Sequence, residues 1–398
     1  MKRANVTISC LLVFLSLLVT FPTKEASACM WDHDTLQMER QRFPGVLEVI
    51  TGKFLRHSKA FYKWRIQDRE KKLRSAPKTL KWYDDLGVAY DKIGNSKRAI
   101  EVMLKKESIK PGLYTTYANL GTFYIHNKQL KKGLVYIRKA LKINPNAHFG
   151  RERYQAWLVE YLLQRQKGGK IPLPLFYEAK KQVKLDVTRP YAPAHPDLTF
   201  VGFLAQKTGT DTRLSQKEHA AALKGILGMM RFGHYRSRIL LEVLAELLLL
   251  TPVEDSKRLA ARAYLQASYQ SKGERVMLYR KQAGDVLRLL VLNKLSYEQV
   301  RLSWVENRFK KELREAKLWH DELVANEKRW IKEANDPDKA FAKVYYKAPV
   351  VSNYEPPQWL LLLMDKVVMR ILLFFGVALL GVLFLLRLLR RVREKKKA

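Results

Sequence analysis

The sequence predicts an all-α protein in which helical hairpins stack into a solenoid, followed by one carboxyl-terminal transmembrane helix. Three observations lead to this fold class. A group of aromatic, leucine and glycine residues recurs at a fixed interval, and long stretches place their apolar residues three or four positions apart. A largely apolar run of about 23 residues lies close to the carboxyl end.

The composition limits the class of protein and suggests a charged partner. With 398 residues, of which 47% are hydrophobic, the chain has enough apolar material for a core, so collagen-like and wholly disordered proteins are excluded. The 74 lysine and arginine residues exceed the 38 acidic ones, and the net charge of +36 favours an anionic partner or surface. The two cysteines, Cys10 and Cys29, are too few for a disulfide-stapled domain or a four-thiolate zinc site.

Residues 1–28 have the features of a secretory signal peptide. A positively charged start precedes an apolar stretch at residues 10–21, and the small residues 26–28 suit a cleavage site. The apolar stretch is short for a membrane span, so we expect the segment to be removed rather than kept as an anchor. Either outcome places the middle of the protein across the membrane.

Cleavage after this segment would make Cys29 the first residue of the mature chain, and three interpretations of it stay open. With Asp32, His33 and Asp34 it could bind a transition metal, although no second group of ligands follows at a suitable spacing. The small residues before it fit the end of a bacterial lipoprotein signal, which would attach lipid to the cysteine. The third interpretation is a free or intermolecularly paired thiol.

After an N-terminal helical segment at residues 29–77, residues 78–170 contain the repeat. Its members return at one fixed interval: Tyr83, Leu86, Gly87 and Tyr90 as Tyr117, Leu120, Gly121 and Tyr124, with Pro77, Pro111 and Pro145 in the same register. The apolar members fall on one helix face, and each glycine lets a paired helix come close. The pattern resembles the tetratricopeptide repeat, a helix–turn–helix unit of about 34 residues. A third unit should begin near His148, but glycines and prolines interrupt its second helix.

The remaining body is predicted to be helical after a break. Residues 171–214 contain several prolines and predict a linker. Helical patterning resumes in residues 215–335, which comprise two further hairpins and a long amphipathic helix within 296–335. That last helix could cap the solenoid or pair with another chain.

The carboxyl end predicts a tether at residues 336–366, a transmembrane helix at 367–389 and a basic tail at 390–398. The stretch Ile371–Leu386 has no charged residue, and its apolar flanks make it long enough to cross the hydrocarbon layer as a helix. Basic residues beside a span stay in the cytoplasm, so the tail is expected inside and the body outside. The signal peptide independently predicts this single-pass orientation.

The resemblance also implies a partner-binding groove, because the first helix of each hairpin lines the concave surface in that family. The residues expected there are Lys81, Asp84, Val88, Asp91, Thr115, Asn119, Thr122 and His126. Asn119 and Arg153 fall at two positions where related domains clamp a carboxyl terminus, whereas the other clamp positions differ. We therefore expect a mixed groove for an extended segment or a helix.

These features predict an exported, membrane-anchored scaffold that binds an unidentified protein at the cell envelope. The alternative is a basic module that binds anionic lipid or polymer surfaces, since cations gather on the second helices of the hairpins: Lys105, Lys106, Lys110, Lys131, Lys132, Arg138, Lys139 and Lys142. Export argues against a nucleic-acid partner. No nucleophile motif or phosphate-binding glycine loop is present, so we expect no enzyme and assign no cofactor or metal.

Overall fold

The computed structural model describes residues 32–175, 199–210, 214–291 and 301–346, all within one compact unit, Met1–Lys347. In these ranges the regular structure is helical, apart from one isolated bridge between Lys167 and Lys170, as the all-α prediction requires. The predicted signal peptide, Cys29 and the predicted span 367–389 lie outside the described residues. Among the helices that are described, none combines the length and the apolar character needed to cross a bilayer.

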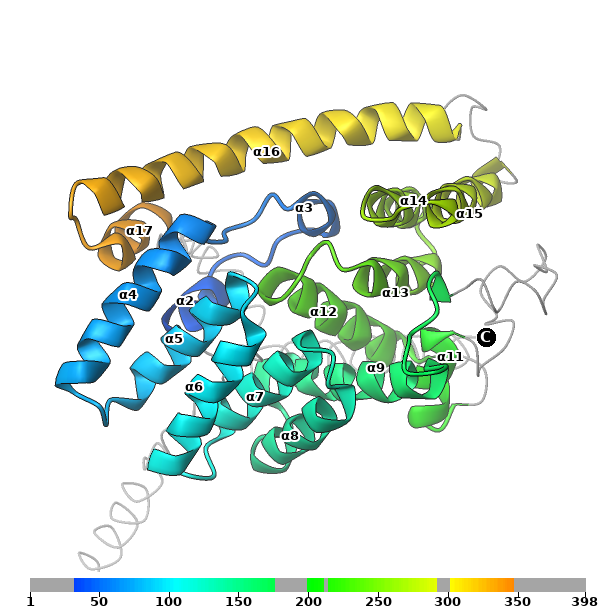
Figure 1. The fold of residues 1–398 in the computed structure, drawn as a ribbon. Coiled ribbons are helices and arrows are strands. Elements are labelled where there is room, and N and C mark those ends of the chain that lie inside the picture. Colours follow the sequence, from blue (N-terminus) through cyan, green and yellow to red (C-terminus); the bar gives the residue numbers. More distant parts are fainter. Residues whose placement is uncertain (1–31, 176–198, 211–213, 292–300, 347–398) are drawn as a thin grey trace, which may run out of the picture. The chain divides into compact units, whose positions relative to one another are not determined.

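The predicted repeat is present as two consecutive helical hairpins (Figure 1). Helices α5 (Leu80–Lys92) and α6 (Ser96–Ile109) form the first, and α7 (Tyr114–His126) and α8 (Leu130–Ile143) form the second. Each helix of the second hairpin begins one repeat interval after its counterpart. The turns match as well, because Gly94 and Lys128 occupy equivalent positions and both have a positive φ, of 94° and 62°. The predicted register is therefore confirmed at both hairpins.

Glycines bring the two helices of the second hairpin into direct backbone contact. A Cβ atom added at Gly121 would lie 2.9 Å from the backbone nitrogen of Ile137, and one added at Gly133 would lie 2.9 Å from the carbonyl oxygen of Gly121. Both distances are too short for any real Cβ contact. The close approach predicted from the repeat pattern is thus explained by these two positions.

The helices that follow the repeats continue the stack. They are α9 (Arg151–Arg165), preceded by the short 3₁₀ turn η2 (Ala147–Gly150), then α11 (Phe200–Lys207), α12 (Gln216–Phe232), α13 (Arg238–Leu249), α14 (Glu254–Tyr269) and α15 (Glu274–Val291). The partner of α9 is α12, although α11 lies between them in the sequence. Gly225 and Gly228 of α12 face Tyr154 and Arg151, so the two helices pack closely. The structure differs from the predicted linker 171–214, because helix α11 lies within that range.

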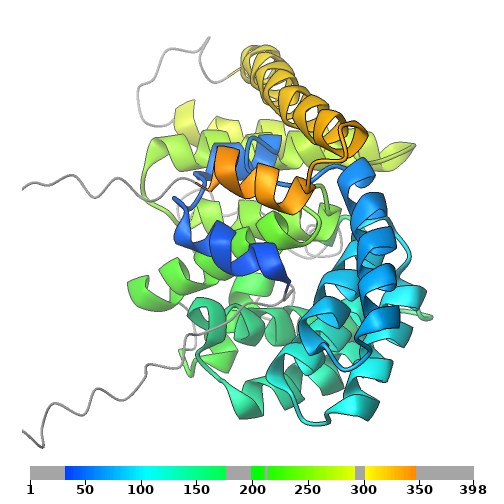
Figure 2. The same cartoon turned by 90° about the vertical axis from the view of Figure 1, so that its left-hand side faces the viewer.

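Three elements precede the repeats and fill the expected N-terminal helical segment: α2 (His33–Arg40), α3 (Val46–Thr51) and α4 (Lys59–Ser75). Asp32 and Ser58 cap α2 and α4, because each side chain accepts a hydrogen bond from the backbone N–H three residues later. Helix α4 packs on α5 and extends the stack by one helix. Figure 2 shows α2 lying beside the repeats, close to the carboxyl-terminal helix of the described chain.

The predicted long amphipathic helix is a single element, α16 (Leu302–Lys332), about 46 Å long. It crosses from α14 and α15 back to α3 and α4 (Figure 1). Its own residues Val305, Phe309 and Leu323 are buried. It therefore packs on its own chain, as the capping interpretation expected. The predicted tether from residue 336 differs in its first part, because α17 (Pro337–Tyr345) begins there, capped by Asp336.

The main apolar core lies among α9 and α11–α15. The buried face of α13 includes Leu241, Leu244, Leu247 and Leu248, so this leucine-rich helix belongs to the core. Smaller apolar clusters lie under the two repeats and beneath the junction of α16 with α17. The described unit is thus one continuous stack, and the stack places α16 over the sites described below.

Candidate functional site

The first helices of the hairpins, α5 and α7, carry the eight residues predicted to line a partner-binding groove. The structure leaves only Lys81 among them exposed. Thr115 and His126 are half-buried, and the remaining five are buried: Asp84, Val88, Asp91, Asn119 and Thr122. These residues do share one face, as expected, but that face is covered.

Part of the cover comes from the repeats themselves. The Lys106 ammonium donates to both carboxylate oxygens of Asp84, at 2.6 and 2.7 Å, and to the Thr115 hydroxyl at 2.8 Å. The Asn119 amide donates to the same carboxylate at 3.2 Å. Burial raises the pKa of Asp84 to about 7, against the opposing effect of Lys106. Lys106 is only 1% exposed, so the prediction that it belongs to an outward basic surface is corrected.

The rest of the cover comes from other parts of the same chain. The N–H of His33 at the start of α2 donates to Asp85 of α5 at 2.9 Å. Val88 and Lys92 lie against Met38 of α2 and Phe232 of α12, around a cavity of only about 30 Å³. A partner that entered the predicted groove would therefore have to displace α2 and the end of α12.

A network of buried charges, which we call the ionic clasp, joins the N-terminal elements to α16 and α17. It consists of Asp34, His57, Arg65, Arg69, Asp85, Glu327 and Asp338. The His57 ring lies between two carboxylates, with Nδ1 2.6 Å from Glu327 and Nε2 2.9 Å from Asp34. Arg65 contacts Asp34 at 2.6 Å, and the Tyr346 hydroxyl donates to Asp34 at 2.9 Å.

The electrostatics of the clasp favour a charged imidazolium. Burial alone would lower the pKa of His57, but Asp34 and Glu327 outweigh it and raise this pKa to about 9. Arg65 and His57 likewise overcome the effect of burial on Asp34 and hold its pKa well below the usual range. The clasp is thus a structural network in which each buried charge lies against at least one charge of opposite sign.

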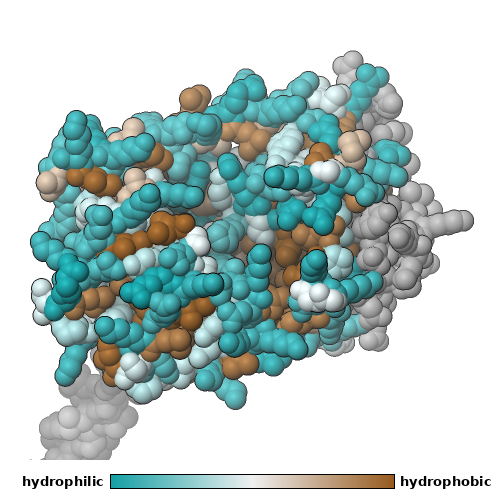
Figure 3. Space-filling model, in the orientation of Figure 1, coloured by the Kyte–Doolittle hydropathy of each residue, from teal (hydrophilic) through white to brown (hydrophobic). Residues whose placement is uncertain are grey.

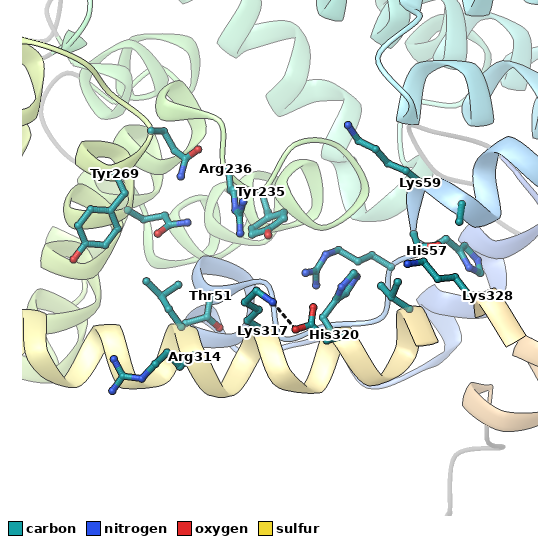
Figure 4. Close-up of a pocket in the computed structure, with 18 residues that line it drawn as sticks. Thr51, His57, Lys59, Tyr235, Arg236, Tyr269, Arg314, Lys317, His320 and Lys328 are labelled. Atoms are coloured by element: carbon teal, nitrogen blue, oxygen red, sulfur yellow. Dashed lines mark hydrogen bonds and ion pairs between the residues drawn. The ribbon is translucent and has the colours of Figure 1, made fainter. Parts of the chain in front are cut away.

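An open cleft of about 750 Å³ lies between α16, the end of α14, the α3–α4 connection and the α12–α13 connection. We call it the cationic cleft, and its cations are Arg56, Lys59, Arg236, Arg314, Lys317 and Lys328. Among the described residues that line it, Asp321 is the one carboxylate, and it pairs with Lys317. Figure 4 shows that the labelled cations around the cleft come from three separate segments: α4, the α12–α13 connection and α16.

The cleft has solvent-exposed cations at its rim and a cation–π contact at its base. Lys59, Arg236, Arg314 and Lys328 are exposed, and hydrophilic residues dominate the surface along α16 in Figure 3. At the floor, the Arg56 guanidinium lies 5.0 Å from the centre of the Tyr235 ring, a cation–π contact that fixes both. Burial and Arg56 lower the pKa of His320 to about 4, so its ring is neutral. The arrangement suits the binding of carboxylates or phosphates.

Sequence reasoning missed this cleft. Its cations come from segments as distant in sequence as Arg56 and Lys328, and each taken alone looks like an ordinary solvated lysine or arginine. The periodic charge along residues 302–332 was the one available signal, but it indicates a polar face without showing what lies opposite. The other basic residues predicted on the second helices, apart from Lys106, are exposed as expected.

Comparison with known proteins identifies the repeat family. A model of the tetratricopeptide repeat matches residues 114–147, which comprise α7, α8 and the start of the following turn. No curated protein matches the chain. No solved structure matches it either. The chain therefore contains a tetratricopeptide repeat, a helical unit of the kind that mediates contact between proteins.

Proposed function

We propose that this protein is an exported, membrane-anchored scaffold that binds an acidic segment of a partner protein in its cationic cleft. The single observation that carries the proposal is that exposed cations from α4, α16 and the α12–α13 connection line one open cleft. The repeat family supports a protein partner. Because the face of α5 and α7 is covered, we favour the cleft over the usual groove as the place of contact.

Charge and shape both favour an extended acidic peptide as the occupant. Arginine side chains can donate two hydrogen bonds to one carboxylate, and Arg236 and Arg314 stand on different walls of the cleft. The half-buried Leu313 and Val324 add apolar contact area between the charges. A segment with alternating acidic and apolar side chains would match this lining.

A crosslinking experiment in intact cells tests the partner. A photoreactive amino acid placed at Val324, inside the cleft, is compared with one at Val135, an exposed position on α8. We expect a specific protein adduct from position 324 that is absent from position 135. Adding Arg314→Glu and Lys328→Glu should abolish the adduct, while the matched pair Lys131→Glu and Lys132→Glu should leave it intact. An adduct that survives the cleft reversal would contradict the proposal.

Export and anchoring rest on the sequence, through the signal-like residues 1–28 and the apolar run 367–389 with its basic tail. Protease added to sealed spheroplasts tests this topology. We expect the body to be digested while a short fragment that contains the basic tail is protected. Digestion only after lysis would place the body in the cytoplasm.

A second candidate function is binding to anionic lipid or envelope polymer, favoured by the exposed basic residues of α6 and α8. Lys105, Lys131, Lys132 and Lys139 all lie exposed there, away from the cationic cleft. Flotation with phosphatidylglycerol vesicles, compared with phosphatidylcholine, separates the two functions. Under this alternative Lys131→Glu with Lys132→Glu reduces flotation, and added salt abolishes it.

A further inference from the structure

A cluster of metal-binding side chains lies at the junction of the repeats with α12. Asp91 near the end of α5, His126 at the end of α7 and His234 in the α12–α13 connection each offer one ligand atom, and these atoms lie within 4.8 Å of one another. From this geometry we propose that Asp91, His126 and His234 bind a divalent first-row transition metal, with Zn²⁺ as the typical occupant. The proposal does not depend on the function proposed for the cationic cleft.

The neighbouring residues already hold two of the three ligands in place. The Ser96 hydroxyl donates to Asp91 Oδ1 at 2.7 Å, so Asp91 Oδ2 faces His126. His126 Nδ1 lies 2.8 Å from Asp91 Oδ2. Two ligands of one tetrahedral zinc ion stand about 3.3 Å apart, given metal–ligand bonds of about 2.0 Å. A small separation of this pair would therefore admit an ion.

The third ligand is held by a contact between α5 and the α12–α13 connection. The Lys92 ammonium donates to the carbonyl oxygens of Phe232 and Gly233, the two residues before His234. The connection is thereby fixed against the end of α5, and the His234 ring centre lies 4.5 Å from that of His126. One carboxylate and two imidazoles form a donor set that suits Zn²⁺, Co²⁺, Ni²⁺ and Cu²⁺.

The site leaves a coordination position open. His126 and His234 lie in the wall of a cavity of about 140 Å³, which Gln155 and Ser237 also line. This volume accommodates a water molecule or a donor atom of a small ligand. The positive charge of Lys92 nearby opposes a cation, so we expect a dissociation constant on the order of micromolar rather than nanomolar.

Titration of the full-length protein with Co²⁺ tests the proposal. The protein is purified in detergent without a histidine tag, freed of metal with a chelator, and followed by visible absorption, since Co²⁺ bound by imidazole and carboxylate has d–d bands. We expect one Co²⁺ per chain, displaced by Zn²⁺. His234→Ala should weaken binding about tenfold or more, and because His234 is exposed this variant should fold.

The matched control is His33→Ala, an exposed histidine at the start of α2. It should leave binding unchanged. His126→Ala should weaken binding as well. If the His126→Ala protein does not fold, the result for His234→Ala alone tests the proposal. Absence of Co²⁺ binding, or binding that His234→Ala leaves intact, would overturn the proposal. Loss of binding in His33→Ala would overturn it too, by assigning the metal to the N-terminal residues.

Discussion

Single glycines set how closely the helices of this protein approach. At Gly121 the added methyl group of an alanine would meet the side chain and the backbone of Ile137, which belongs to the paired helix α8. Backbone atoms cannot yield as the end of a flexible side chain can. In contrast, Leu302 at 3.9 Å is the one neighbour within reach of Gly284 in α15 among the residues that the structure describes, and a side chain fits there. Glycine is therefore required by the close helix contact at position 121, whereas the space around position 284 also admits alanine.

We predict that Gly121→Ala lowers the free energy of unfolding by about 1–3 kcal/mol, because α7 and α8 must separate. Gly284→Ala is the matched control. It should raise stability by about 0.5–1 kcal/mol, since alanine loses less backbone freedom than glycine in a helix. Urea denaturation followed by circular dichroism measures both. Equal effects of the two substitutions would contradict the close contact at Gly121.

At the scale of elements, the two hairpins fill one equivalent position in different ways. Asp84 and Lys106 join α5 to α6 by a buried ion pair. The equivalent residues one repeat later are Ala118 and Ala140, both fully buried between α7 and α8. The repeat geometry therefore tolerates either a charge pair or two small apolar residues, provided that both helices change together.

We predict that Lys106→Met destabilises the protein by about 3–5 kcal/mol, because it leaves Asp84 buried without its cation. The double variant Asp84→Ala with Lys106→Met should recover most of that loss. Lys105→Met, a substitution at the exposed neighbouring position, serves as the control and should be neutral. A double-mutant cycle by urea denaturation gives the coupling. Additive effects of the two substitutions would show that the pair contributes nothing beyond packing.

At the scale of the whole described unit, the ionic clasp links residues that are far apart in sequence. His57 and Glu327 are 270 positions apart, and Arg65 reaches Asp338 over 273. Because buried carboxylates need their cations, loss of the His57 charge should loosen the contact between α2, α4, α16 and α17. The clasp thus makes the junction of these four helices sensitive to pH.

The pKa of His57 is raised to about 9 in the folded protein, from 6.5 when unfolded. Its stabilising contribution is therefore full below pH 6.5 and is lost as the pH rises through 9. We predict that the unfolding free energy falls by about 3 kcal/mol over this interval. In His57→Gln the deficit relative to the unaltered protein should shrink as the pH rises. A deficit that stays constant from pH 6 to 9.5 would contradict this assignment, and His33→Gln should follow the unaltered protein throughout.

Local patterns in the sequence predicted the local structure well. The repeat interval located both hairpins, and apolar spacing predicted the helical region 215–335 that contains α12–α16. Short elements were missed because α11 and α17, with 8 and 9 residues, carry too little periodicity, and Pro337 suggested a break although proline is favoured at a helix start.

Long-range structure could not be predicted in the same way. The sequence predicted an open groove along α5 and α7, because nothing in these helices indicates that α2 and the end of α12 cover them. His57, Glu327 and the cations of the cleft become neighbours only through tertiary packing. Periodicity describes one element at a time, so it cannot show which distant segment completes a buried charge pair or the opposite wall of a cleft.

The meeting of the two ends of the described chain has a mechanical consequence. Asp32 lies 3.5 Å from Arg65, while Tyr346 donates to Asp34, so both ends reach the ionic clasp. A tensile force applied between residues 32 and 346 would load that cluster together with the contacts of α2 to Asp85 and Arg231. Rupture of these contacts would release α2 and expose the part of the repeat face that α2 covers.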